Sequence, residues 1–143
     1  MATFSVSGID EIASAFSRTA NVPDNIKQNV LTEMGHIVME AQKSEGESKV
    51  GRDPNSSVHF IDNITLSKPK LTGDGGYVKV TFKGSRRRGN TETRNAEIAF
   101  INEYGKKGQP ARPFIRPANE KSAEQAREKG ADVLHSWVEN NFK

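Results

Sequence analysis

Residues 24–44 read DNIKQNVLTEMGHIVMEAQKS and form the most strongly periodic segment of the chain. Apolar side chains recur there at spacings of three and four residues, which indicates a helix with one buried face. That face consists of Ile26, Val30, Leu31, Met34, Ile37, Val38 and Ala41. The polar residues His36, Glu40 and Lys43 fall on the other side. The pattern predicts a core helix over 24–44, against which the other elements must pack.

The segment before this helix predicts a short arm and a first helix. Phe4 and Val6 alternate with polar residues, which favours a strand or an extended arm. Ser7 and Asp10 then match a capping box, in which each side chain bonds the backbone N–H of the other residue. The apolar residues between 9 and 20 share one side of a helical wheel, so a helix is expected there.

The segments after the core helix predict a loop, three strands and a last helix. Residues 45–57 are polar and without periodicity. Residues 59–66, 77–82 and 96–100 have the alternation of strands, and no helical pattern separates them, so an antiparallel sheet is expected. A helix is predicted over 117–140, because proline suits a first helical position. Its apolar stripe is Ala123, Ala126, Gly130, Val133, Leu134 and Trp137.

This element order predicts a single α+β domain over residues 1–143. It would contain two N-terminal helices, a three-stranded antiparallel sheet, and a long C-terminal helix packed on the sheet; the N-terminal arm could add a fourth strand. Leu, Ile, Val and Phe make up only 30 of the 143 residues, so the core is thin. The loops near 45–57, 83–95 and 104–116 are therefore expected to be mobile and to order mainly against neighbouring subunits.

The sequence shows no signature of an enzyme. The absence of cysteine excludes disulfides, cysteine-ligated zinc and thiol catalysis. The three histidines lack metal-ligand spacing, and the glycines of 73–76 lack the lysine and helix of a phosphate loop. No run approaches the roughly 18 apolar residues of a membrane span, and the first residues lack a secretory signal pattern. We expect a non-enzymatic cytoplasmic protein that uses no cofactor and does not contact a membrane.

The formal net charge of +3 is unevenly distributed. Residues 1–58 carry 5 basic and 8 acidic side chains, whereas residues 59–143 carry 16 and 10. The basic excess lies in two stretches rich in glycine, proline or asparagine, 83–94 and 104–121. Both stretches are therefore expected to be loops.

Arg86, Arg87 and Arg88 are the densest part of this charge. Three interpretations remain open: a solvated hairpin tip, a contact with an acidic protein surface, or a contact with nucleic-acid phosphates. No aromatic residue is interleaved between 83 and 94, so this stretch offers no platform for stacking bases.

The last helix carries an acidic stripe of Glu120, Glu124, Glu128 and Asp132 at spacings of four residues. Like charges at this spacing destabilise an isolated helix by roughly 0.2–0.5 kcal/mol per pair. Arg127 can relieve Glu124, and the helix N-terminus favours the first two carboxylates. Glu128 and Asp132 lack a cation at the best spacing. We hypothesise that these two contact the basic loop of a neighbouring copy.

Residues 102–118, NEYGKKGQPARPFIRPA, form the most distinctive run. Three prolines within eight residues fix the backbone and disfavour helix before each of them. The run is expected to be a rigid connector, in which Phe114 docks on the core while Arg112 and Arg116 stay in solvent.

This run resembles a signature of the small tail-completion or head–tail joining proteins of tailed, lambda-like bacteriophages. In that family a Glu-aromatic-Gly is followed by a short loop and then Pro-Ala-x-Pro-Phe-(Ile/Leu)-Arg-Pro-Ala before the last helix. Residues 103–105 and 110–118 match this pattern, and residues 6–12 resemble the family's opening strand and helix. The chain differs at 56–60, which read SSVHF where many members carry a Thr-Gly-x-Leu turn.

The resemblance implies a structural virion protein that oligomerises as a ring at the phage head–tail junction. Such a protein helps the completed tail to join the head. Its implied partners are copies of itself, the head–tail connector, and tail-tube or tail-terminator proteins, with genomic DNA as a further partner if a basic loop faces the lumen. The implied location is the virion, and the host cytoplasm during assembly.

The residues expected to contact a partner or DNA are Arg86, Arg87, Arg88, Arg112, Phe114 and Arg116. Those expected to contact a neighbouring subunit are Glu128 and Asp132. The alternative function is a small cytoplasmic nucleic-acid-binding protein that uses the same basic loops.

Overall fold

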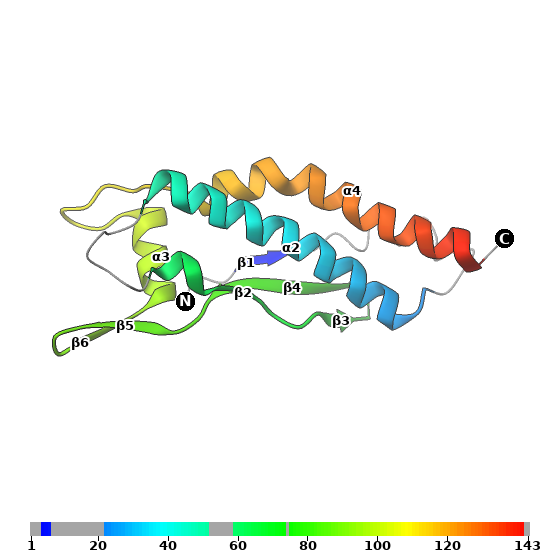
Figure 1. Cartoon of the computed structure of the whole chain (residues 1–143), viewed down its shortest axis with the longest axis horizontal. Helices are drawn as coiled ribbons and strands as arrows, with labels where there is room; N and C mark the ends of the chain where they lie inside the picture. The colour runs from blue at the N-terminus through cyan, green and yellow to red at the C-terminus, as the bar shows by residue number, and fades with distance from the viewer. Residues whose placement is uncertain (1–3, 7–21, 52–58, 74, 142–143) are drawn as a thin grey trace.

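The computed structural model describes residues 4–6, 22–51, 59–73 and 75–141, so the helix predicted between 9 and 20 lies outside the described residues. The elements are β1 (Phe4–Val6), α2 (Asp24–Lys49), the 3-10 helix η1 (Phe60–Asn63), β2 (Ile64–Leu66), β3 (Lys70–Thr72), β4 (Gly75–Phe82), β5 (Ser85–Arg88), β6 (Thr91–Arg94), α3 (Asn95–Tyr104) and α4 (Ile115–Asn141). The fold is α+β, as predicted, with two long helices above a small sheet (Figure 1).

The sheet is built around β4. On one edge β1 pairs antiparallel with it, with Phe4 opposite Val80, so the N-terminal arm is a strand as predicted. On the other edge β2 and then β3 pair with β4. In the stretch that separates β2 from β3, the Ser67 hydroxyl accepts a hydrogen bond from the N–H of Lys79 at 2.8 Å, so the contact with β4 continues there. The strand β3 was not predicted from the sequence.

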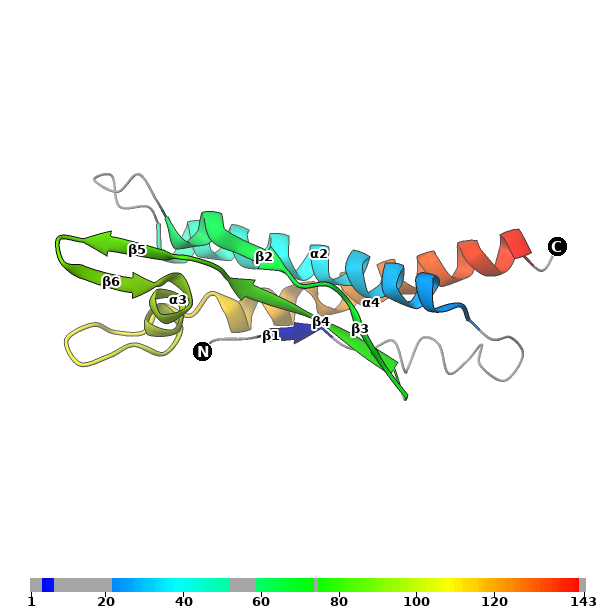
Figure 2. The ribbon, with the colours of Figure 1, turned by 90° about the horizontal axis from the view of Figure 1, so that it is seen from below.

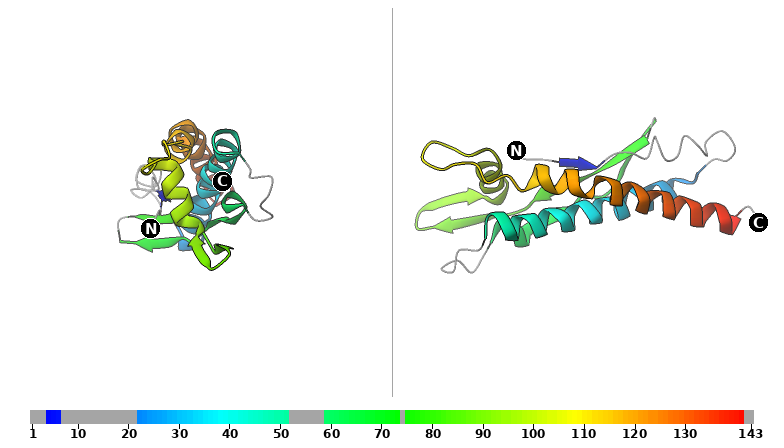
Figure 3. Two further views of the ribbon diagram at one scale, coloured as in Figure 1. Left: turned by 90° about the vertical axis from the view of Figure 1, so that its left-hand side faces the viewer. Right: turned by 90° about the horizontal axis from the view of Figure 1, so that it is seen from above.

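Helix α2 lies on the sheet, and α4 runs antiparallel along α2 (Figures 1 and 3). The predicted stack of the C-terminal helix directly on the sheet is therefore wrong, because α2 makes most of the contact with the strands. A Cβ on Gly35 of α2 would lie within 2.7 Å of Leu66 and Val78, which shows how closely this helix approaches the sheet. Val78, Val80 and Phe82 of β4 are buried, as their alternation predicted.

The core helix extends five residues beyond its predicted end, into the segment 45–57 that was expected to be a loop. Tertiary contacts explain the extension. The Glu45 carboxylate accepts a hydrogen bond from Lys121 of α4 at 2.6 Å, which lowers the pKa of Glu45. Gly46 packs closely against Ile61 and Phe114. These partners are distant in sequence, so local polarity gave the wrong boundary.

The predicted strand over 96–100 is wrong, because these residues belong to α3. The buried residues of α3 are Asn95, Ala96, Ile98, Ala99, Asn102 and Glu103, which is a helical spacing. A five-residue window showed only the alternating part of that pattern. The predicted loop over 83–95 is also wrong, since β5 and β6 form an antiparallel hairpin with Arg86 opposite Thr93. The predicted strand over 59–66 begins as the turn η1 and becomes extended only at Ile64.

Helix α4 begins at Ile115, two residues before its predicted start. Its buried residues are Ile115, Ala118, Ser122, Ala126, Gly130 and Leu134. Ala123 is exposed, contrary to the prediction, because the buried stripe follows a spacing of four residues through Ser122 and Ala126. Four small side chains in succession, from Ala118 to Gly130, allow α4 to lie close to its neighbours.

The two alanines provide a test of this packing. Ala126→Leu should destabilise the protein by about 1–3 kcal/mol, because it overpacks a buried position that has only 1% of its surface exposed. The control Ala123→Leu should change stability by less than about 0.5 kcal/mol, because that position faces solvent. Urea unfolding followed by circular dichroism measures both; equal effects would contradict the position of the stripe.

Candidate functional site

The fold brings the two basic stretches of the sequence to one end of the molecule. The β5–β6 hairpin and the loop over 105–114 project in the same direction beyond the ends of α2 and α4, on either side of α3 (Figures 1 and 2). We call this region the basic end and define it by Arg86 and Arg87 of the hairpin and by Lys106, Lys107 and Arg112 of the loop.

The buried carboxylate of Glu103 fixes the start of α4 at this end. One oxygen accepts the backbone N–H groups of Phe114 and Ile115 at 2.8 Å each, and the other accepts that of Arg116 at 3.0 Å. Pro117 has no N–H, so no donor is left without a partner at that position. Glu103 thus caps α4 from a different helix with charge-assisted hydrogen bonds.

The loop between the two helices has a defined shape. Gly105 has a φ of 78°, and a Cβ there would lie 2.8 Å from the nitrogen of Ala111, so glycine is required. The backbones of Lys106 and Gln109 exchange two hydrogen bonds of 2.9 Å. The N–H of Arg112 donates to the carbonyl of Asn102 at 2.6 Å. This loop is therefore tied to α3, with Arg112 held beside its C-terminal half.

Phe114 anchors the end of the loop in the core. Its side chain is fully buried and makes edge contacts with the rings of Phe60 and Phe82, at 5.8 and 6.0 Å between centroids. The expected docking of this residue on the core is confirmed. Its expected role as a partner contact is wrong, because no part of the side chain reaches the surface.

A cavity of about 440 Å³ opens between the hairpin, α3 and the loop. We call it the basic cavity, because three cationic side chains line it: Arg86, Lys106 and Arg112. Its other lining residues are His59, Asn102, Gln109, Thr93, Val50, Gly51, Phe60, Ile98 and Ile101. None of these described residues is acidic. Within the described part of the chain, the three cations form no ion pair with a carboxylate.

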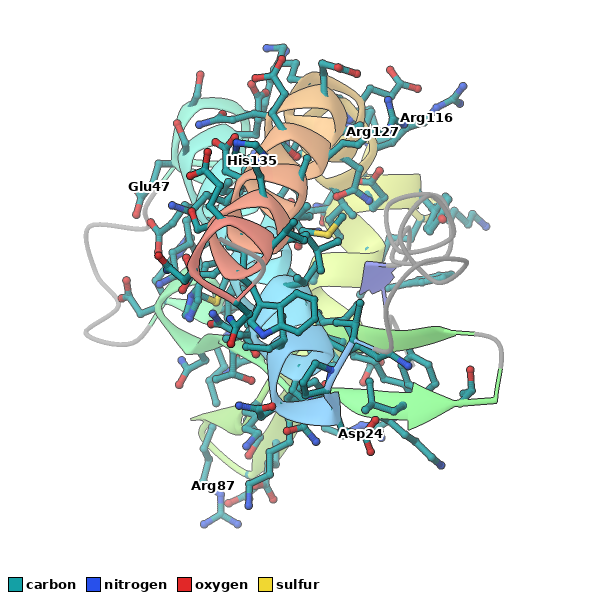
Figure 4. All side chains as sticks on the ribbon, turned by 90° about the vertical axis from the view of Figure 1, so that its right-hand side faces the viewer. Asp24, Glu47, Arg87, Arg116, Arg127 and His135 are labelled. Carbon is teal, nitrogen blue, oxygen red and sulfur yellow. The ribbon has the colours of Figure 1, made fainter. Side chains whose placement is uncertain are left out.

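The remaining predicted arginines lie elsewhere. Neighbouring strand residues face opposite sides, so half-buried Arg86 lines the cavity whereas Arg87 is exposed on the other face of the hairpin. Arg88 pairs with Thr91 through the strand, and its side chain lies outside the described residues. Arg116 is exposed and bonds Glu120 at 3.0 Å. Figure 4 shows Arg87 and Arg116 on opposite sides of the molecule. Of the predicted arginines whose side chains the structure describes, only Arg86 and Arg112 share the cavity.

The predicted subunit contacts, Glu128 and Asp132, are exposed on α4. Neither forms an ion pair with a described residue. They follow Gln125 by three and seven residues, so they lie on the same side of α4 as that glutamine. Gln125 lines a groove between α4 and α2, about 380 Å³ in volume, together with Glu33 and Glu40.

Glu33 and Glu40 line this groove, and Glu128 and Asp132 lie on the side of α4 that carries Gln125. We call these four carboxylates the acidic face. Lys43 is 3.6 Å from Glu40, and Lys121, on the same side of α4, is engaged by Glu45. Lys129 is exposed one turn before Asp132 without forming an ion pair with it. Among the described residues, Glu33, Glu128 and Asp132 of the acidic face therefore have no ion-pair partner.

Sequence reasoning missed an exposed aromatic pair on α3. Phe100 and Tyr104 are 49% and 63% exposed, and their ring centroids lie 4.8 Å apart. The spacing of four residues would have identified the pair on a helix, but 96–100 was assigned to a strand. Large apolar side chains at this exposure beside the basic end suit a protein contact.

The described residues contain no cluster of three or more acidic or histidine side chains suited to a metal ion. None of the described helices is long and apolar enough to cross a membrane. Comparisons of the chain with protein-family models, curated proteins and solved structures gave no match. The function is therefore inferred from the basic end, the acidic face and the sequence signature.

The cap by Glu103 predicts a large loss of stability on neutralisation. Glu103→Gln should cost about 2–3 kcal/mol, because an amide cannot accept three N–H groups and its own NH2 opposes one of them. The control Glu97→Gln, on the exposed side of α3, should change stability by less than about 0.5 kcal/mol. Urea unfolding measures both. A similar stability for both variants would contradict the capping role.

Proposed function

We propose that this chain is a structural virion protein that oligomerises as a ring at the phage head–tail junction and helps join the completed tail to the head. The observation that supports this most is the signature at 103–118. Glu103 caps α4, Gly105 permits the turn, and Phe114 anchors the loop. The run that resembles the phage family thus fixes both ends of the loop over 105–114, which carries Lys106, Lys107 and Arg112.

The charge distribution supports self-assembly. Arg86, Lys106 and Arg112 at the basic end form no ion pair with a described carboxylate. Glu128 and Asp132 lie roughly 20–25 Å along α4 from its start, given a rise of 1.5 Å per residue. A contact between two different surfaces of identical chains is heterologous, and it generates either a closed ring or an open filament. A closed ring is the assembly that a junction between head and tail requires.

The exposed side chains of the basic end support contacts with other virion proteins. Phe100 and Tyr104 of α3 offer exposed apolar area, and the exposed Lys106 and Lys107 follow Tyr104 closely in the chain. We propose the head–tail connector and the tail-tube or tail-terminator proteins as partners. If the ring exposes Arg87 to its lumen, genomic DNA becomes a further contact.

Removal of the protein during virion assembly tests this function. Full heads and finished tails should accumulate separately, because each forms without the joining protein, and purified protein added later should restore joined particles. Electron microscopy and sedimentation of the lysate measure both outcomes. Normal particles without the protein would contradict the proposal.

A DNA-binding measurement separates the alternative. The isolated protein should bind duplex DNA weakly at physiological salt, because contacts between a few cations and the phosphates give only salt-sensitive, non-specific binding. Fluorescence anisotropy with labelled DNA, at two salt concentrations, measures this. Tight binding by the monomer, without assembly, would favour a nucleic-acid-binding protein instead.

A further inference from the structure

The basic cavity concentrates positive charge without neutralising it. Arg86 reaches it from β5, and Lys106 and Arg112 reach it from the loop. Like charges that share a partly enclosed space repel one another more strongly than they would in open water. No described acidic residue lines the cavity to offset this. The arrangement is suited to binding an anion.

The lining residues of the basic cavity indicate which class of anion it can bind. Phe60, Ile98 and Ile101 give the cavity an apolar side, and Asn102 and Gln109 give it amide groups. Carboxylates on aliphatic stems satisfy both, because the stem contacts the apolar wall while the oxygens meet the guanidinium groups. A volume of about 440 Å³ has room for more than a single small ion.

We infer that Glu128 and Asp132 on α4 of a second copy dock in the basic cavity and are bound there by Arg86 and Arg112. This inference rests on the proposed self-assembly and specifies the surfaces that make it. The two carboxylates lie one helical turn apart, so one helix can present both to the cavity at once. Both are exposed and lack a partner in their own chain among the described residues.

Other carboxylates of α4 are poorer candidates. Glu120 is bonded by Arg116 at 3.0 Å, and Glu124 by Arg127 at 2.7 Å. Arg116 and Arg127 lie on the same side of α4 (Figure 4), away from the side that carries Glu128. Glu128 and Asp132, and Arg86 and Arg112, have no ion-pair partner among the described residues, so their charges can complement each other between copies.

Arg86 and Arg87 give a matched pair for the test. They are adjacent and carry the same charge, but only Arg86 lines the cavity. Replacement of Arg86 should therefore weaken self-assembly much more than the same replacement of Arg87, which removes an equal charge from the other face of the hairpin.

The decisive experiment is a charge swap in the full-length protein. One variant carries Arg86→Glu with Arg112→Glu, and a second carries Glu128→Lys with Asp132→Lys. Each alone should self-associate at least tenfold more weakly than the unaltered protein, because like charges then meet at the contact. Mixed together they should assemble, because the reversed cavity of one copy accepts the reversed helix of the other. Analytical ultracentrifugation measures assembly, and thermal melts followed by circular dichroism show that each variant is folded.

The possible failures are distinguishable. Three outcomes would overturn the docking inference without contradicting the proposed ring. The first is a cavity variant that assembles normally, and the second is an Arg87→Glu variant that impairs assembly as much as Arg86→Glu. The third is a pair of folded variants that do not assemble when mixed. Loss of DNA binding by the cavity variant, with assembly unchanged, would also overturn it in favour of a phosphate contact. An unaltered protein that remains monomeric at all concentrations, alone and with heads and tails, would contradict the proposed function itself.

Discussion

The hydrogen bonds between the Glu103 carboxylate and the first backbone N–H groups of α4 hold the two ends of the loop together. A carboxylate that accepts three N–H groups satisfies donors that every helix start leaves unpaired, and it does so inside the protein, where an unpaired donor is most costly. Because Glu103 belongs to α3, the bonds also join α3 to α4. The position of Arg112, and with it the shape of the basic cavity, depends on this joint.

Packing of the aromatic core also fixes the start of α4. Phe114, directly before α4, packs against Phe60 of η1 and Phe82 of β4, which also contact each other, so the loop is anchored to the sheet as well as to α3. Gly46 of α2 lies against Phe114 and lets the helix approach it. A chain with few large apolar residues thus concentrates aromatic packing where the connector must be rigid. The charged side chains outside the joint remain available for contacts with other molecules.

Sequence patterns predicted the two long helices better than several of the short elements. The seven apolar positions of residues 24–44 repeat over several turns, which a strand cannot imitate, whereas 96–100 span barely more than one turn and fit both periods. The end of α2 was missed because Lys121 and Phe114 stabilise a polar helical segment from far away in the chain. The sequence predicted where the basic residues are concentrated, but not which of them share a cavity. Arg86 and Arg87 cannot be distinguished until the pairing of β5 with β6 shows which face of the hairpin each side chain occupies.

The sequence alone determined the α+β class, the core helix α2, the alternation of β4, the docking of Phe114 and the two basic stretches. Each of these follows from local periodicity, backbone restriction or composition, which act within one segment. The tertiary structure alone decided that 95–104 is a helix, that Glu103 caps α4, and that Arg86 and Arg112 line one cavity. Those features need contacts between residues far apart in the chain, and such contacts are set by how the helices pack on the sheet.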